Sequence, residues 1–274
     1  HEGRDLRIDL IRGYFVFAMI VDHVRGASPL YLITGGNRFY TSAAEGFILT
    51  SGLVAGLVYR RLIKRDGLAP ALVKVLNRAF TLFLLTVGLT LLFTVFSEFA
   101  ALPWAQGINF SNPVDWVLNV FTLHRTYYLV DVMLLYTVLF VLSPLALLLL
   151  EQGKWYYVLL PSALLYIIYQ FYPQAVMLPW QIEGNYLFNF SAWQVLFFGG
   201  LVMGFHQERI PTMGCRTTRV GIVLTGVLTV ALIAAFYLID TPTSLTPSEI
   251  ATGSPIPQET RLWLQDNLFS KTDL

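Results

Sequence analysis

Residues 7–26, "RIDLIRGYFVFAMIVDHVRG", form an apolar stretch that carries Asp9, Arg12, Asp22 and His23. Histidine is the side chain best suited to proton transfer near neutral pH, so His23 is a candidate general base. If the stretch is a helix, Arg12 and His23 lie within about 20° of one line and about 16 Å apart along the axis. Charges inside a membrane helix are costly and usually mark a functional site or a buried ion pair. This polar face should therefore point toward the protein interior or a water-filled cavity.

A structural interpretation of the same residues is also open. The arginines of this segment can pair with Asp5 and Asp9 at one membrane surface, while His23 reaches toward the other surface. The alignment of His23 with Arg12 favours the functional interpretation, because a helix end at the interface does not need it. Asp22 lies about 100° from His23 around the helix, and it can orient the imidazole if the helix ends there.

The next apolar stretch, "SAAEGFILTSGLVAGLVY", places Glu45, Gly52 and Gly56 within about 40° of one line. The two glycines form a G-x-x-x-G pair, which lets another helix approach closely. Plain helix packing is therefore a sufficient reason for the glycines. A carboxylate on a packed face needs a partner, and we expect Glu45 to pair with Arg12 or Arg38.

Polar side chains from several separate segments are expected at one end of the molecule, the end that faces outward. Their convergence predicts a substrate-binding site, although a polar belt at the membrane interface would show the same pattern. The residues are His23, Arg38, Glu45, His124, Arg125, Asp131, Asn189 and Gln194.

The elements that position these residues are predicted to be membrane helices. Of the 274 residues, 55% are hydrophobic and 13% are charged, whereas soluble domains carry about 25% charged residues. We therefore predict an all-α, polytopic transmembrane helix bundle in residues 1–239, followed at 240–274 by an outward polar loop that leads to a short amphipathic or further helix. The seven expected spans are approximately 7–25, 42–60, 72–97, 127–150, 155–172, 190–206 and 219–239. A short interfacial helix, 113–121, is expected between the third and fourth spans, with Asn112 as its cap and Pro113 in its first turn.

The basic residues predict the orientation of the bundle. Between the second and third spans the sequence carries Arg60, Arg61, Lys64, Arg65, Lys74 and Arg78. Basic loops stay in the cytoplasm, so the N-terminus is expected there too. The loops 26–41, 98–126 and 173–189 then face outward.

Other function classes find little support in the composition. The formal net charge of +1 indicates no basic field for nucleic acid. A single cysteine excludes an internal disulfide framework. The four histidines have neither an i,i+4 partner nor a cysteine cluster, so no metal site is expected.

Three blocks of the sequence resemble the OpgC family of integral membrane proteins, which are associated with succinylation of osmoregulated periplasmic glucans. The blocks are "RDLRIDLIRGYFVFAMIVDH", "TSAAEGFILTSGLVAGLVYRR" and "FNFSAWQVLFFGG", in that order. More broadly, they resemble the membrane-bound acyltransferase family 3, which has an arginine and a histidine separated by ten residues on its first helix, as Arg12 and His23 are. The phenylalanine-rich "SG" stretch of that group corresponds here to Phe47, Ser51 and Gly52. Members usually have about ten spanning helices, so the resemblance implies further helices beyond this chain.

The resemblance implies an enzyme of the bacterial inner membrane. It would transfer an acyl group, such as succinyl, from a cytoplasmic acyl-CoA to a hydroxyl of a glucan or other glycan outside. Both are substrates, so no tightly bound cofactor is expected. His23 would activate the hydroxyl, and Arg12 would hold the charge of the donor. Asp22 and Glu45 complete the expected catalytic group, and the expected substrate-binding residues are Asp9, Arg7, Arg38, Ser51, His124, Asp131, Asn189, Trp193 and Gln194.

Two other classes of function are open at this point. A transporter or flippase for a glycan or lipid-linked sugar would use buried charges as a substrate pathway. The sequence lacks the paired Gly/Pro-broken helices that many transporters show. A non-catalytic membrane scaffold would tolerate the loss of His23. Only the enzyme predicts new ester bonds that depend on His23.

Overall fold

The computed structural model describes most of the chain up to residue 207 and isolated positions between 223 and 234. The described ranges are 6–23, 30–34, 42–99, 112–127, 130–173, 176–185 and 187–207. The chain divides into two compact units. The first unit comprises residues 1–12 and 45–209, and the second comprises residues 13–44 and 210–274.

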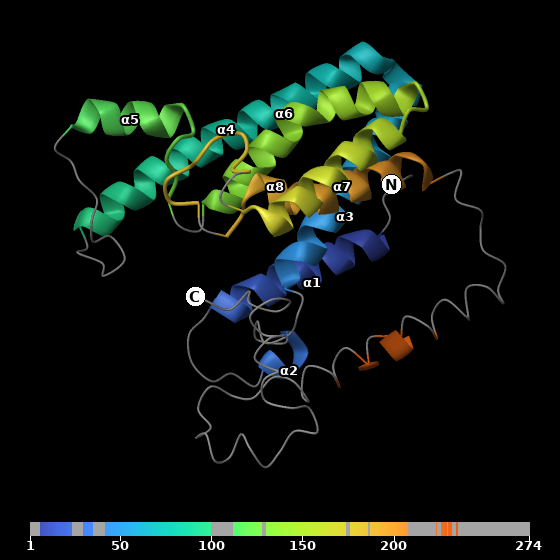
Figure 1. Ribbon diagram of the computed structural model, residues 1–274, viewed down its shortest axis with the longest axis horizontal. Helices are drawn as coiled ribbons and strands as arrows, with labels where there is room; N and C mark the ends of the chain where they lie inside the picture. The colour runs from blue at the N-terminus through green and yellow to red at the C-terminus, as the bar shows by residue number, and fades with distance from the viewer. Residues whose placement is uncertain are drawn as a thin grey trace. The chain divides into compact units, whose positions relative to one another are not determined.

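The protein is an all-α membrane bundle. The described residues form α1 (Leu6–His23), α2 (Tyr31–Thr34), α3 (Ala43–Asp66), α4 (Leu68–Phe99), α5 (Pro113–Phe121), α6 (Asp131–Glu151), α7 (Tyr156–Phe171) and α8 (Phe190–Phe205) (Figure 1). Among them the β-structure is one isolated bridge, between Arg125 and Glu183. The short helix α5 confirms the expectation for 113–121, since the Asn112 side chain accepts a hydrogen bond from the Asp115 backbone N–H.

Three described helices are long and apolar enough to cross a membrane: Ala43–Asp66, Leu68–Ser97 and Asp131–Glu151. They confirm the second, third and fourth predicted spans. α7 and α8 match the fifth and sixth but have 16 residues each, or about 24 Å, less than the roughly 30 Å of a hydrocarbon core. α1 matches the first predicted span, but its charged side chains exclude it from the three. Most of 219–239 and all of 240–274 lie outside the described residues.

The prediction of a basic loop between the second and third spans was wrong in its local structure. α3 continues to Asp66 and α4 starts at Leu68, so only Gly67 separates the two helices. The φ angle of Gly67 is 91°, which favours glycine and reverses the chain in one residue. The basic residues of this region therefore lie on helices, and those at the end of α3 are stabilised by the helix dipole.

The predicted start of the fourth span also required correction. The sequence suggested a helix from residue 127, but α6 begins at Asp131. Tyr127 is not helical, and Thr126 just before it donates its backbone N–H to the Glu183 carbonyl oxygen over 2.9 Å. This long-range pairing holds the chain in a non-helical conformation immediately before the predicted start of the span.

Helix α3 packs directly on the backbone of α8 through its two predicted glycines. A Cβ atom at Gly52 would overlap the Phe197 carbonyl oxygen, and one at Gly56 would overlap the Leu201 carbonyl oxygen. The prediction that the G-x-x-x-G pair allows close approach of another helix is therefore confirmed.

Helix α8 contributes a second pair of glycines with the same spacing to this contact. A Cβ atom at Gly200 would overlap the Leu49 carbonyl oxygen, and one at Gly204 would overlap the Leu53 carbonyl oxygen. In a lipid environment apolar burial does not drive helices together, so close backbone packing and weak Cα–H···O contacts carry more of the association. The two glycine pairs therefore make α3 and α8 one unit of packing.

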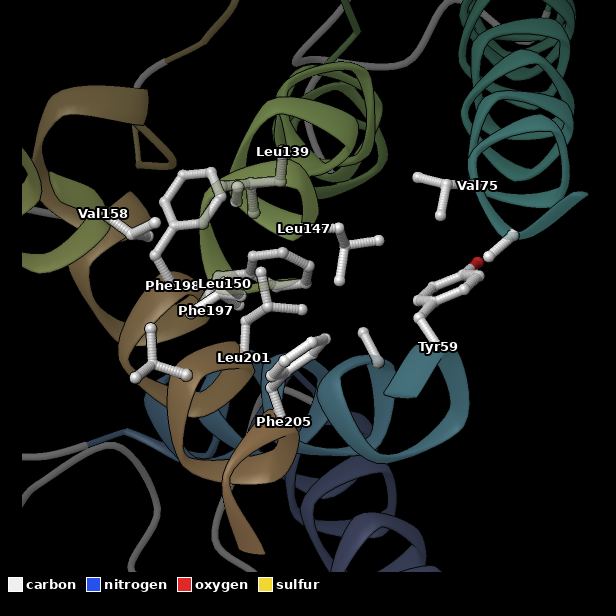
Figure 2. Close-up of a cluster of buried hydrophobic side chains, with 14 of the residues drawn as sticks. Tyr59, Val75, Leu139, Leu147, Leu150, Val158, Phe197, Phe198, Leu201 and Phe205 are labelled. Carbon is white, nitrogen blue, oxygen red and sulfur yellow. The ribbon is translucent and has the colours of Figure 1, made fainter. Parts of the chain in front are cut away.

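A buried apolar cluster joins five helices of the first unit around α6. Figure 2 shows side chains of α6 and α8 converging with side chains from α3, α4 and α7. The labelled residues are Tyr59, Val75, Leu139, Leu147, Leu150, Val158, Phe197, Phe198, Leu201 and Phe205. α4 runs alongside α6, and α7 runs alongside α8 (Figure 1). Helix α6 is therefore the central helix of the first unit, and its axis serves as the reference for the two ends of the bundle.

The two ends of α6 carry different chemistry. At its C-terminus, Glu151 accepts a hydrogen bond from Arg60 of α3, with Nη1 and Oε2 2.7 Å apart. The Arg60 guanidinium also lies 4.8 Å from the centroid of the Phe205 ring. We call this the Arg60 end and the opposite one, where α6 begins, the Asp131 end. The 21 residues of α6 extend about 31 Å, which is the thickness of a hydrocarbon core.

Two adjacent glycines of α8 test the backbone contact. Gly200→Ala places a methyl group against the α3 backbone and should destabilise the protein by about 1–3 kcal/mol. Gly199→Ala is the matched control, because no neighbouring heavy atom lies within 4 Å of its Cβ position. Alanine has the higher helix propensity by about 1 kcal/mol, so this variant should be neutral or slightly stabilised. Thermal unfolding in detergent measures both, and equal effects would contradict the contact.

Candidate functional site

His23 is the last residue of α1 and belongs to the second unit. Its Nδ1 lies 2.6 Å from the Met19 carbonyl oxygen, and its side chain is exposed. A carbonyl oxygen can only accept, so Nδ1 carries the proton and the neutral imidazole keeps a lone pair on Nε2. This arrangement suits a general base that acts through Nε2.

The neighbouring Asp22 helps to attach α2 to α1. Thr34 donates its hydroxyl to Asp22 Oδ1 over 2.6 Å. Tyr14 donates its hydroxyl to the Ile33 carbonyl oxygen over 2.7 Å. The His23 ring is thus oriented at Nδ1 by a backbone carbonyl, while Asp22 holds the segment that follows the helix.

Arg12 belongs to the first unit, where its guanidinium group contacts an aromatic group from α3 and α6. Its Cζ lies 5.8 Å from the centroid of the Phe47 ring, which is within cation–π range. Tyr136 packs edge-on against the same ring with centroids 5.9 Å apart, and its hydroxyl donates to the Phe47 carbonyl oxygen over 3.5 Å. The Arg12 Nε is buried, and among the described residues it has no hydrogen-bond partner. Such an N–H can bind an anion or a carbonyl oxygen.

The other predicted charges near α1 and α3 lie at helix starts. Asp9 is in the first turn of α1, and Glu45 is in the first turn of α3. The helix dipole stabilises a carboxylate at this position. Both side chains and Arg7 take part in interactions within the protein, and their roles toward Arg12 or His23 stay predictions. Arg38 lies outside the described residues.

Asn189 and Trp193, which were predicted to bind substrate, use their polar atoms within the start of α8. Asn189 is the N-cap of the helix, and its Oδ1 accepts a hydrogen bond from the Ser191 backbone N–H at 2.9 Å. Trp193 donates its indole N–H to the Leu187 carbonyl oxygen over 2.7 Å. These bonds stabilise the entry of the chain into α8, and substrate contact by either residue stays a prediction.

Gln194 connects α8 to α7. Its Nε2 donates to the Ser162 carbonyl oxygen over 2.7 Å, and its Oε1 accepts from the Ser162 hydroxyl. The side chain is buried. Both ends of the amide are thus used in one interhelical contact, which is a favourable arrangement in a membrane.

Asp131 is buried at the first position of α6. Its Oδ1 accepts a hydrogen bond from the Val132 backbone N–H at 3.0 Å. The N-terminal partial charge of the helix also stabilises this carboxylate. Asp131 therefore contributes to the start of the central helix, and its predicted contact with substrate is not tested by these contacts.

His124, the remaining predicted site residue, lies in a cluster formed by two loops at the Asp131 end. We call residues 122–127 and 180–184 the two-loop cluster. The His124 and Trp180 rings stack with centroids 4.9 Å apart and planes at 11°. Arg125 forms an ion pair with Glu183, in which Nε and Oε2 are 3.0 Å apart.

Comparison with known families identifies the chain. The family described as OpgC protein matches residues 4–274, almost the whole sequence. The chain belongs to the OpgC family. No curated protein and no solved structure matches it.

The structure of this OpgC family member also adds residues that the sequence interpretation missed. Tyr136 completes the aromatic group around Arg12, and Trp180 and Glu183 complete the two-loop cluster. Tyr136 lies within an apolar helix and has no spacing that sets it apart. An isolated tryptophan in the segment "LPWQIEG" signals only a residue suited to an interface.

A double-mutant cycle on Ser162 and Gln194 tests the structural role of this pair. Gln194→Met leaves the Ser162 hydroxyl without its partner, so it should destabilise the protein, and Ser162→Ala should do so too. Because both changes break one contact, the double variant should lose less stability than the sum, with a coupling of about 0.6–1.7 kcal/mol. Unfolding in detergent measures each term. Strict additivity would contradict the contact.

Proposed function

We propose that this OpgC family member is an O-acyltransferase of the bacterial inner membrane, with its N-terminus in the cytoplasm. It moves an acyl group, such as succinyl, from a cytoplasmic acyl-CoA to a hydroxyl of an extracytoplasmic glucan. Family membership supports the reaction class and the glucan acceptor. Within the chain, the proposal is carried by the hydrogen bond between His23 Nδ1 and the Met19 carbonyl oxygen, because it leaves Nε2 as the basic nitrogen.

His23 acts on the acceptor hydroxyl. A sugar hydroxyl is a weak nucleophile, so Nε2 takes its proton as the oxygen attacks the thioester carbonyl carbon. The new C–O bond gives a tetrahedral intermediate with a negatively charged oxygen. This intermediate collapses with cleavage of the C–S bond, and the imidazolium returns the proton to the leaving thiolate. The products are a sugar ester and free coenzyme A.

Arg12 serves the acyl donor. Its buried Nε is an N–H donor without a partner among the described residues, so it can bind a charged or carbonyl group of the donor. The contact with the Phe47 ring restricts the guanidinium group. Asp9 and Glu45 are the proposed orienting carboxylates for Arg12 and His23.

The Arg60 end is the proposed entrance for the donor. Arg61, Lys64 and Arg78 are exposed on the last turns of α3 and the first turns of α4. Three cationic side chains at one end of the bundle attract the phosphates of coenzyme A. The same charges also act as a topology signal. Attraction of the donor and a topology signal alone predict different values of the KM for acyl-CoA when these charges are removed.

The role of His23 can be tested on glycans from bacteria that make the full-length protein. We expect a fixed mass increment on the glycans, removed by mild base, that His23→Ala reduces by about 10²–10⁴-fold in rate. His206→Ala is the matched control, because its Nδ1 also faces the carbonyl oxygen four residues earlier, 3.2 Å away at Val202. Mass spectrometry of both glycan pools measures the increment.

The outcomes of this experiment separate the function classes. Loss of the ester in His23→Ala alone, at equal protein levels, supports acyl transfer with His23 as base. Identical glycans in all three strains would refute that role. Export of unmodified glycan that depends on the protein would identify a transporter instead.

The entrance for the donor can be tested by kinetics in proteoliposomes. Arg61→Gln combined with Lys64→Gln removes two exposed charges. We expect the KM for acyl-CoA to rise several-fold with little change in kcat, because only the attraction of the donor is weakened. A charge-only topology signal predicts an unchanged KM among correctly oriented molecules. Raising the salt concentration should reduce the difference between the wild-type and variant proteins.

A further inference from the structure

The two-loop cluster is held together by its backbone. Thr126 donates its N–H to the Glu183 carbonyl oxygen over 2.9 Å, and Glu183 donates its N–H to the His124 carbonyl oxygen over 2.8 Å. Gly184 has a φ angle of 85°, and a Cβ there would overlap the Thr126 carbonyl oxygen. Two loops separated by nearly 60 residues of chain are therefore fixed to each other.

The charges of this cluster compensate each other. Arg125 is paired with Glu183, and its guanidinium group also lies 6.0 Å from the centroid of the Trp116 ring. The Glu183 side chain is mostly exposed. A carboxylate has about four acceptor sites, so Glu183 can accept hydrogen bonds from hydroxyl groups while it holds Arg125. The pair thus favours a neutral ligand with hydroxyl groups over an anion.

Trp180 supplies a rigid aromatic surface beside this pair. The His124 ring covers part of the indole, and the residue remains 42% exposed. Its indole N–H is bonded to the Leu123 carbonyl oxygen at 3.0 Å. A tryptophan that anchors a protein at the membrane interface presents its polar tip to the wet side. Trp180 instead uses that tip to fix its ring, which leaves an apolar surface for a ligand.

The position of the cluster matches the acceptor side of the proposed reaction. It lies at the Asp131 end, whereas the exposed cations for the donor lie at the Arg60 end of the same helix. In a protein oriented by its basic residues, the Asp131 end faces outward. Sugar rings have one apolar face of C–H groups and a rim of hydroxyls, which complement an aromatic surface beside a carboxylate.

We propose that the two-loop cluster is a carbohydrate-binding platform, in which Trp180 stacks on a neutral hexose unit of the acceptor glucan and Glu183 accepts its hydroxyl hydrogen bonds. The choice of a glucan rests on the proposed function. The platform would hold the polymer while another unit reaches the reacting group, so it is a binding site and not a catalytic one.

The test is direct binding of sugar to the full chain in detergent, without any acyl donor. The probes are glucose hexasaccharides of several linkages, and the readouts are calorimetry and saturation-transfer NMR on the sugar C–H protons. We expect saturable binding that Trp180→Ala weakens at least about tenfold. Trp180→Phe keeps an aromatic ring and should weaken binding less. Trp155→Ala is the matched control, because this tryptophan is 47% exposed at the start of α7.

The outcomes are separable from those of the acyl-transfer experiment. Absence of saturable binding to the wild-type protein with every linkage would overturn the platform. Equal affinities of the wild-type and Trp180→Ala proteins would do so as well, and a tryptophan that serves only as a membrane anchor gives this result. Sugar binding in a protein that forms no ester would support the platform and refute the proposed function. If Trp180→Ala does not fold, saturation transfer to the wild-type protein and the affinity of Trp180→Phe decide.

Discussion

The contact between the glycine faces of α3 and α8 is the constraint on which the first unit depends. Lipid tails are as apolar as leucine side chains, so helices in a membrane gain little from burying apolar surface. Close backbone contact supplies dispersion energy instead, and only glycine permits it here. The Phe197 carbonyl that covers Gly52 belongs to the residue whose ring packs on Tyr136. Tyr136 in turn packs on Phe47, so the helix contact also builds the aromatic group that receives Arg12.

The central helix α6 separates two chemical environments in the first unit. Its C-terminus meets Arg60 and lies near exposed cations, and its N-terminus leads back to the two-loop cluster, in which charges are paired. The proposed enzyme would take a charged thioester from one side of the membrane and a neutral polyol from the other, and these two environments suit those two substrates. The amide of Gln194 is engaged within the protein, by Ser162. Nε of Arg12 and Nε2 of His23 are the nitrogens on which the proposed chemistry depends.

Several features could be predicted from the sequence because they are local. Composition and hydropathy identify the membrane class and the helices that became α3, α4 and α6, since a spanning helix satisfies its own backbone hydrogen bonds. The cap at Asn112 depends on residues within one helical turn. The pair Gly52 and Gly56 predicts close approach by its spacing alone. Acid–base chemistry at His23 stays a prediction from the residue types on α1, to which the structure adds the contact between Nδ1 and the Met19 carbonyl oxygen.

Tertiary structure alone decided which residues meet. The sequence did not identify Gly200 as a residue that contacts the glycine face of α3. The spacing of small residues shows that a helix face lacks side chains, but it does not show which helix packs against that face. The sequence also did not predict the hydrogen bonds between Gln194 and Ser162, and substrate contact by Gln194 stays a prediction. It also missed Trp180, whose ring stacks on a histidine more than 50 residues away. Pairings between distant segments depend on the packing of whole helices, and no local pattern encodes them.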